Sequence, residues 1–199
     1  YKALRRGIMD FERRQVYRGP EKFISLPNDP QELDDAIDDA LDENPDNGDV
    51  MSAIVLEADA KKIKAVRQNS ELVEITGDGL KPAQSGLAEK APPNIKIRRG
   101  ALIRVSKTSK GTWEITQLPE VEGAFVALDP RDGSIKALVG GFDFQKNKFN
   151  HVTQAWRQPG SSFKPFIYSA SLEKGYSPSS IINDEPIVIN STQTGSQDW

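Results

Sequence analysis

The chain has 199 residues, enough for one large or two small domains, with a formal net charge of −3 and no cysteine. The lack of cysteine excludes a disulfide framework, thiolate metal sites and cysteine nucleophiles, and the acidic balance argues against wholesale nucleic-acid binding. Because His151 is the only histidine, a multi-histidine metal site within one chain is impossible, and we expect His151 to be a solvated loop residue.

Two helices are predicted before the first strands. Residues 1–16 carry an apolar stripe that begins at Leu4 and follows the spacing i, i+4, i+7. The second helix has clear end signals, because Asp29 is a candidate N-cap, Glu32 would complete a capping box, and Asn44 precedes a proline that ends the pattern.

The acidic segment 42–49 invites comparison with a calcium-binding loop. The glycine that such a loop needs is displaced by one position, and Ala53 occupies the place of the bidentate glutamate. We therefore expect a solvated helix end and turn instead of a calcium site.

From residue 50 the apolar pattern changes to a period of two, which predicts strands. We expect these strands at residues 51–57, 61–66, 72–75, 101–105 and 112–116. A connection rich in Gly, Pro, Ser and Ala separates the third strand from the fourth. Five short strands with one long excursion, in about 70 residues, favour a small Greek-key barrel of the OB type, and a plain antiparallel sheet is the alternative.

A basic segment between residues 96 and 110 lies near Trp113. It consists of Lys96, Arg98, Arg99, Arg104, Lys107 and Lys110. On an OB fold such a surface can bind single-stranded nucleic acid, and Arg98, Arg99, Arg104 and Lys107 would carry that function. Since only one aromatic residue accompanies these charges, we favour a solvated, charged strand pair and keep the nucleic-acid-binding module as an alternative.

A second β unit and a helix complete the chain. Two apolar strands, residues 123–128 and 134–139, are predicted to form a hairpin, and a polar loop then leads to a helix that ends near residue 174. Pro165 is tolerated only in the first turn of a helix, which places the helix start close to Ser161.

Ser161 and Lys164 stand three residues apart at this predicted helix start. Positions i and i+3 share a helix face, and a serine becomes a competent nucleophile when a base lies within hydrogen-bond reach. The backbone N–H groups of the first turn also favour negative charge there. The spacing therefore predicts a Ser-Lys acyl-transfer site, and an N-cap serine followed by a solvated lysine is the alternative.

The chain contains a second serine and lysine with the same spacing, Ser171 and Lys174. This pair precedes Gly175, a predicted helix C-cap, where the helix dipole has the wrong sign to stabilise an alkoxide. We expect Ser171 to be an ordinary helix residue.

Three segments in order carry a specific resemblance to a known family. Residues 123–130, 133–141 and 157–166, which hold the predicted hairpin and the Ser-x-x-Lys helix, resemble the start of the transpeptidase domain of class A, bifunctional penicillin-binding proteins. Residues 3–21 resemble the stretch that follows the glycosyltransferase domain of that family, and the predicted barrel lies where the family carries an OB-like insert.

The resemblance implies a fold class and a division into domains. The fold is α+β and mainly β, with a small OB-like antiparallel β-barrel inserted next to the N-terminal part of a transpeptidase domain like that of penicillin-binding proteins and β-lactamases. Residues 1–49 would form a helical interdomain linker, 50–118 the OB-like module and 119–199 the N-terminal portion of the transpeptidase domain. The chain would then be a piece of a longer protein, soluble by itself.

The resemblance also implies a chemistry. Ser161 would attack the penultimate D-alanine of a peptidoglycan stem peptide, Lys164 would take its proton, and β-lactam antibiotics would acylate the same serine; no metal or organic cofactor is implied. The family also uses a Ser-x-Asn motif and a Lys-Thr-Gly motif, and neither occurs after Lys164. We therefore expect the piece to be inactive alone.

Partners and location follow from the same resemblance. The parent protein would be a peptidoglycan glycosyltransferase and D,D-transpeptidase, anchored in the inner membrane by a segment absent here and facing the periplasm. The OB-like module would bind an outer-membrane lipoprotein activator and no nucleic acid. A non-catalytic interaction scaffold, in which the Ser-x-x-Lys spacing is accidental, remains a further alternative.

Overall fold

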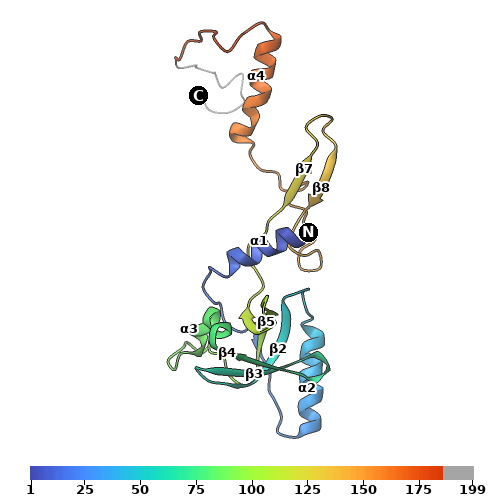
Figure 1. Ribbon diagram of the computed structural model, residues 1–199, viewed down its shortest axis with the longest axis vertical. Helices are drawn as coiled ribbons and strands as arrows, with labels where there is room; N and C mark the ends of the chain where they lie inside the picture. Colours follow the sequence, from blue (N-terminus) through green and yellow to red (C-terminus); the bar gives the residue numbers. More distant parts are fainter. Residues whose placement is uncertain (186–199) are drawn as a thin grey trace, which may run out of the picture. The chain divides into compact units, whose positions relative to one another are not determined.

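The computed structural model describes residues 1–185 and divides into two compact units, residues 1–155 and a second unit that begins at Trp156 (Figure 1). The helices are α1 (Lys2–Glu12), α2 (Pro30–Glu43), α3 (Gln84–Leu87) and α4 (Lys164–Glu173), with 3₁₀ segments η1 (Gln68–Ser70), η2 (Gly77–Ala83) and η3 (Gly160–Phe163). The strands are β1 (Lys22–Phe23), β2 (Met51–Ala58), β3 (Lys62–Arg67), β4 (Glu71–Thr76), β5 (Ala101–Lys107), β6 (Trp113–Thr116), β7 (Phe125–Leu128) and β8 (Ile135–Val139).

The first unit contains a six-stranded antiparallel sheet with the order β1-β5-β2-β3-β4, and β6 pairs with β5. Strand β5 pairs with β2 along one edge, where Leu102 lies opposite Ile54, and with β1 and then β6 along the other. Strand β6 also approaches β4, so the sheet curls toward a closed barrel. Strands β2 to β6, with η2 and α3 between the third and the fourth of them, therefore follow the five-stranded Greek-key pattern predicted from the sequence.

Two apolar clusters hold this barrel together, one on each face of β2. Val55 and Ile103 point into the barrel interior, whereas Ile54 and Leu102 point outward and pack against Ile37 and its neighbours on α2. Full burial of each aliphatic side chain contributes about 1.5–3 kcal/mol. Both faces of these two strands are covered, so residues 52–55 of β2 and 101–106 of β5 are all buried. Figure 1 shows α2 beside the sheet.

Local capping fixes both ends of α2. The Asp29 carboxylate accepts hydrogen bonds from the backbone N–H groups of Gln31 and Glu32 at 3.0 and 3.2 Å, and the Asn44 side chain donates to the carbonyl of Ala40 at 2.7 Å. The predicted start and end of this helix are confirmed.

The first helix is shorter than predicted, because it ends at Glu12 and not near residue 16. Tyr17 is buried in the barrel core, so the chain has to leave the helix before that position. Val16 has nothing to pack against and is 81% exposed.

Gly100 allows the chain that follows β1 to lie close to the residue just before β5. Its φ is +84°, and a Cβ atom at this position would lie 2.3 Å from the carbonyl oxygen of Ile24. The Gly100 carbonyl accepts a hydrogen bond from the Ile24 N–H at 2.8 Å, and its own N–H donates to Val55. Only glycine satisfies this close approach.

Strands β7 and β8 form a separate antiparallel two-stranded sheet, as predicted. Its apolar side chains are largely exposed in the described part of the chain: Phe125, Val126, Leu128, Ile135 and Leu138. The hairpin is anchored at its base by Phe142, which is fully buried against Ile8 and Met9 of α1 and Val50.

Candidate active site

Ser161 and Lys164 lie on one continuous helical run in the second unit. Ser161 belongs to the 3₁₀ turn η3, Lys164 is the first residue of α4, and the Lys164 N–H donates a hydrogen bond to the Ser161 carbonyl. Gly160, with φ of +54°, directs the chain into this turn, and Pro165 stands in the first turn of α4 as predicted. The two side chains therefore leave the backbone one turn apart.

The serine does not serve as a helix cap. The N-cap residue of α4 is Phe163, that of η3 is Pro159, and neither terminus has a side-chain capping bond. The N-cap interpretation of Ser161 is therefore wrong.

The side chains of Ser161 and Lys164 are both exposed. Within residues 1–185, neither the Ser161 hydroxyl nor the Lys164 amine makes a hydrogen bond or an ion pair, and no hydrogen bond joins the two. Catalytic hydrogen bonds often form only when substrate is bound. The backbone thus supplies the spacing between the two groups, and neither group has a bonding partner among the described residues.

Large apolar side chains of η3 and α4 are also exposed: Phe163 of η3, and Phe166, Ile167, Tyr168 and Leu172 of α4. The α4 helix ends at Glu173, and Lys174 is its C-cap. Gly175, with φ of +88°, follows directly, and the N–H of Tyr176 donates to the Ser171 carbonyl at 3.1 Å. The Ser171 hydroxyl donates to the Ile167 carbonyl at 2.9 Å, as expected for an ordinary helix residue.

The basic segment does not form one solvated surface. Arg104 is buried, and its guanidinium donates to both carboxylate oxygens of Glu21 at 2.9 and 2.8 Å and to the Ser52 hydroxyl at 2.6 Å. The prediction of a solvated residue is wrong for Arg104, and this residue is not available to a phosphate. Lys107 remains exposed, with its amine 4.7 Å from the ring centre of Trp113.

Two further predictions of solvated residues need correction. In the acidic segment, Asp46 pairs with Arg67 at 2.6 Å and accepts a hydrogen bond from the Ser52 N–H. His151 is half-buried, with its Nδ1 3.0 Å from the Gly140 carbonyl oxygen and its ring edge-on to that of Phe149. Within residues 1–185, no group of three or more His, Asp or Glu side chains is arranged to hold a metal ion.

Asp129 closes the β7–β8 hairpin and carries a perturbed carboxyl group. Its two carboxylate oxygens accept from the Arg131 guanidinium at 3.0 and 2.7 Å, and one also accepts from the Arg131 backbone N–H. These hydrogen bonds favour the charged form and lower the pKa of Asp129 to about 2.

The Asp129 interaction predicts a specific pH dependence. Because the folded-state pKa lies below the ordinary value of about 3.9, the stabilisation is present above about pH 4 and is lost as the pH falls toward 2. A carboxyl ¹³C NMR titration should place the Asp129 midpoint near 2, and Arg131→Met should move it toward the ordinary value. A midpoint near 4 in the unsubstituted protein would contradict this assignment.

Comparison with known proteins places the chain in a family. Residues 17–121 match the family model of the penicillin-binding protein OB-like domain, and residues 123–199 match that of the penicillin-binding protein transpeptidase domain. Since the first match alone covers more than half of the chain, the chain belongs to the penicillin-binding proteins. The family and the fold class predicted from the sequence are confirmed.

Within this family, curated relatives of the chain include proteins named penicillin-binding protein 1A. The chain is 39% identical over 186 residues to the protein of that name from Neisseria lactamica (93% of this chain, 23% of the relative), and 36% identical over 192 residues to that from Pseudomonas aeruginosa (94% and 23%). It also resembles a crystal structure of penicillin-binding protein 1A from Haemophilus influenzae, with a TM-score of 0.71 and 30% identity over 100% of this chain and 28% of that one. The chain spans about a quarter of the length of the curated relatives it matches.

Proposed function

We propose that this chain is part of a bifunctional peptidoglycan synthase of the penicillin-binding protein 1A type and carries the nucleophile of its serine D,D-transpeptidase. The observation that supports this most directly is the turn that sets Ser161 and Lys164 one helical turn apart, within the residues that match the transpeptidase family. A hydroxyl and an amine in this arrangement fit acyl transfer without a cofactor.

In the proposed reaction, the Ser161 hydroxyl oxygen attacks the carbonyl carbon of the penultimate D-alanine, and its proton passes to the Lys164 amine. The Ser161 N–H would donate to the developing oxyanion, together with a donor from a later strand. The carbon–nitrogen bond then breaks, the terminal D-alanine leaves with a proton, and an acyl-enzyme remains. A β-lactam follows the same first step, but its leaving nitrogen stays attached to the acyl group.

The exposed apolar surfaces support the proposed place of this chain in a larger domain. The side chains of the β7–β8 sheet and of α4 present more large apolar surface than an isolated soluble unit usually exposes. We therefore propose that further structure of the transpeptidase domain covers these surfaces in the full-length protein. The Ser-x-Asn and Lys-Thr-Gly motifs would lie in that structure, and the present chain alone would be inactive.

The remaining functions of the parent are proposed from the family resemblance of the sequence. They comprise glycosyltransferase activity, an inner-membrane anchor with a periplasmic catalytic part, and binding of an outer-membrane lipoprotein activator to the OB-like module. Within residues 1–185 no helix combines the length and apolar character needed to cross a bilayer. The division into domains at 1–49, 50–118 and 119–199 also stays a prediction. In this division, the linker segment adds strand β1 to the sheet of the OB-like module and packs helix α2 against that sheet.

Mass spectrometry of the acylated protein tests the proposed nucleophile. The full-length protein is incubated with benzylpenicillin and digested with trypsin, and residues 158–174 are expected as one peptide because the bond between Lys164 and Pro165 resists cleavage. The expected adduct has the mass of the intact β-lactam and maps to Ser161. An adduct on Ser162 or Ser171, or no adduct, would refute the proposal.

A further inference from the structure

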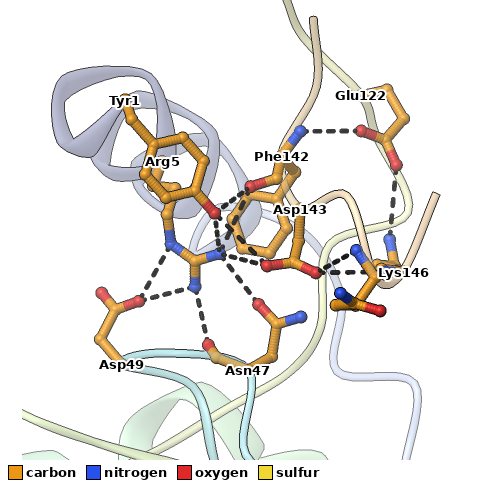
Figure 2. Close-up of polar contacts among 9 residues, drawn as sticks. Tyr1, Arg5, Asn47, Asp49, Glu122, Phe142, Asp143 and Lys146 are labelled. Carbon is orange, nitrogen blue, oxygen red and sulfur yellow. Dashed lines mark hydrogen bonds and ion pairs between the residues drawn. The ribbon is translucent and has the colours of Figure 1, made fainter. Parts of the chain in front are cut away.

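A buried arginine joins three segments that are distant in the sequence. Arg5 lies on α1, and its side chain lies between the loop that precedes β2 and the loop that follows β8 (Figure 2). Its guanidinium donates to the Asn47 carbonyl at 2.8 Å, the Asn47 side-chain oxygen at 2.9 Å and Asp49 at 2.7 Å. It also donates to the Phe142 carbonyl at 3.4 Å. One side chain thus bonds to both loops.

The same guanidinium covers an aromatic ring. Its central carbon lies 4.1 Å from the ring centre of Phe142, which is fully buried. Beneath that ring lie Ile8, Met9 and Val50, which come from α1 and from the residue just before β2. We call Arg5, Phe142 and these three apolar residues the joint. It combines a planar cation on an aromatic face with an apolar core shared by three segments.

The loop after β8 is also held from its other side. The Glu122 carboxylate accepts a hydrogen bond from the Phe142 N–H at 3.2 Å and lies 3.8 Å from the Lys146 amine. Glu122 belongs to the connection between β6 and β7, so the chain segment that enters the hairpin and the one that leaves it meet at Phe142. Figure 2 shows Arg5 and Glu122 on opposite sides of the Phe142 backbone.

Arg5 is buried, and its set of contacts requires the planar guanidinium group. Burial alone disfavours the charged form, but hydrogen bonds to Asp49 and Tyr1 outweigh it and raise the pKa of Arg5 above its ordinary value. The partner carboxylate of Asp49 is 71% exposed, and exposed ion pairs contribute little. The guanidinium also contacts two carbonyl oxygens and the Phe142 ring, and lysine cannot reproduce this planar set of contacts.

We propose that Arg5 is a positioning residue that fixes the β7–β8 hairpin to the OB-like domain through Phe142. Without it, the Phe142 carbonyl keeps the hydrogen bond from the Tyr1 hydroxyl at 2.9 Å, but the Phe142 ring loses its guanidinium cover and the loop after β8 loses its bridge to residues 47–49. The hairpin can then turn about the connection at Glu122. The consequence for acylation rests on the proposed function, since the hairpin belongs to the transpeptidase match that also contains Ser161.

Hydrogen exchange of the full-length protein tests this role directly. Arg5→Met should raise amide exchange at least about tenfold in residues 47–50 and 140–146 together, while the amides of β3 and β4 keep their protection. Arg5→Lys should produce the same pattern with a smaller amplitude, and it decides the outcome if the methionine variant does not fold. Arg6→Met is the matched control, because Arg6 lies beside Arg5 on α1 and makes no hydrogen bond or ion pair within residues 1–185.

A second readout separates positioning from the proposed chemistry. The second-order rate of acylation by benzylpenicillin should fall about tenfold in Arg5→Met and change less than twofold in Arg6→Met and in Asp49→Asn. The proposed role is overturned if exchange stays at the wild-type level in both loops, if it rises equally throughout the OB-like sheet, or if acylation is unaffected while both loops open. If the unsubstituted protein is not acylated at all, the proposed function fails, and the exchange result still decides whether Arg5 holds the joint.

Discussion

Full-length protein with Ser161→Ala is expected to lose covalent labelling by fluorescent penicillin, with the acylation rate falling by about 10³-fold or more. Alanine keeps the turn η3, because the Ser161 side chain makes no capping bond and is exposed. The substitution therefore removes the attacking oxygen and leaves in place the hydrogen bond from the Lys164 backbone N–H to the carbonyl of residue 161. Gel fluorescence at a fixed penicillin concentration over time measures the rate.

The chain supplies two matched controls for this experiment. Ser162 is the next residue of the same turn, and Ser171 has the same spacing to a lysine but donates its hydroxyl to the Ile167 carbonyl. Ser162→Ala and Ser171→Ala should both label at close to the wild-type rate. Persistent labelling of Ser161→Ala, with loss of labelling in either control, would assign the nucleophile to another serine.

Elements with local end signals were predictable from the sequence. The α2 helix begins and ends where Asp29 and Asn44 predict, because both residues bond to backbone groups within four positions. The barrel strands were predictable for a related reason, since alternation along a strand directly reports which face is buried. The turn from Ser161 to Lys164 was predictable from a local signal too, because Pro165 restricts where the helix starts.

Residues whose partners are distant in the sequence were not predictable. Arg104 appears in the sequence as one of several strand cations, but its burial depends on Glu21, which lies 83 positions away. Arg5 appears as one of several arginines on an amphipathic helix, and only the folded chain brings Phe142 beneath it. A stretch of charged residues gives no sign of which member is enclosed, because the enclosing acceptors are carbonyl and carboxylate groups elsewhere in the chain.

The same limit applies to the candidate site. Sequence spacing predicts that a hydroxyl and an amine leave the backbone one turn apart, and the bond from the Lys164 N–H to the Ser161 carbonyl confirms that spacing. The spacing does not determine the environment of the amine, which decides whether the amine can be neutral and accept a proton. The role of Lys164 therefore needs its own experiment.

Lys164→Arg and Lys164→Met in the full-length protein are both expected to lower the rate of penicillin acylation by about 10²–10⁴-fold, the usual contribution of a general base. Arginine retains the positive charge but does not deprotonate in proteins, so it tests proton acceptance separately from electrostatic attraction. Stopped-flow acylation kinetics across pH 6 to 10 measure both variants, with Lys174→Met as the control at the other end of the same helix. If Lys164→Arg acylates at close to the wild-type rate while Lys164→Met does not, the residue acts through its charge, and the proton of Ser161 has to pass to a different base.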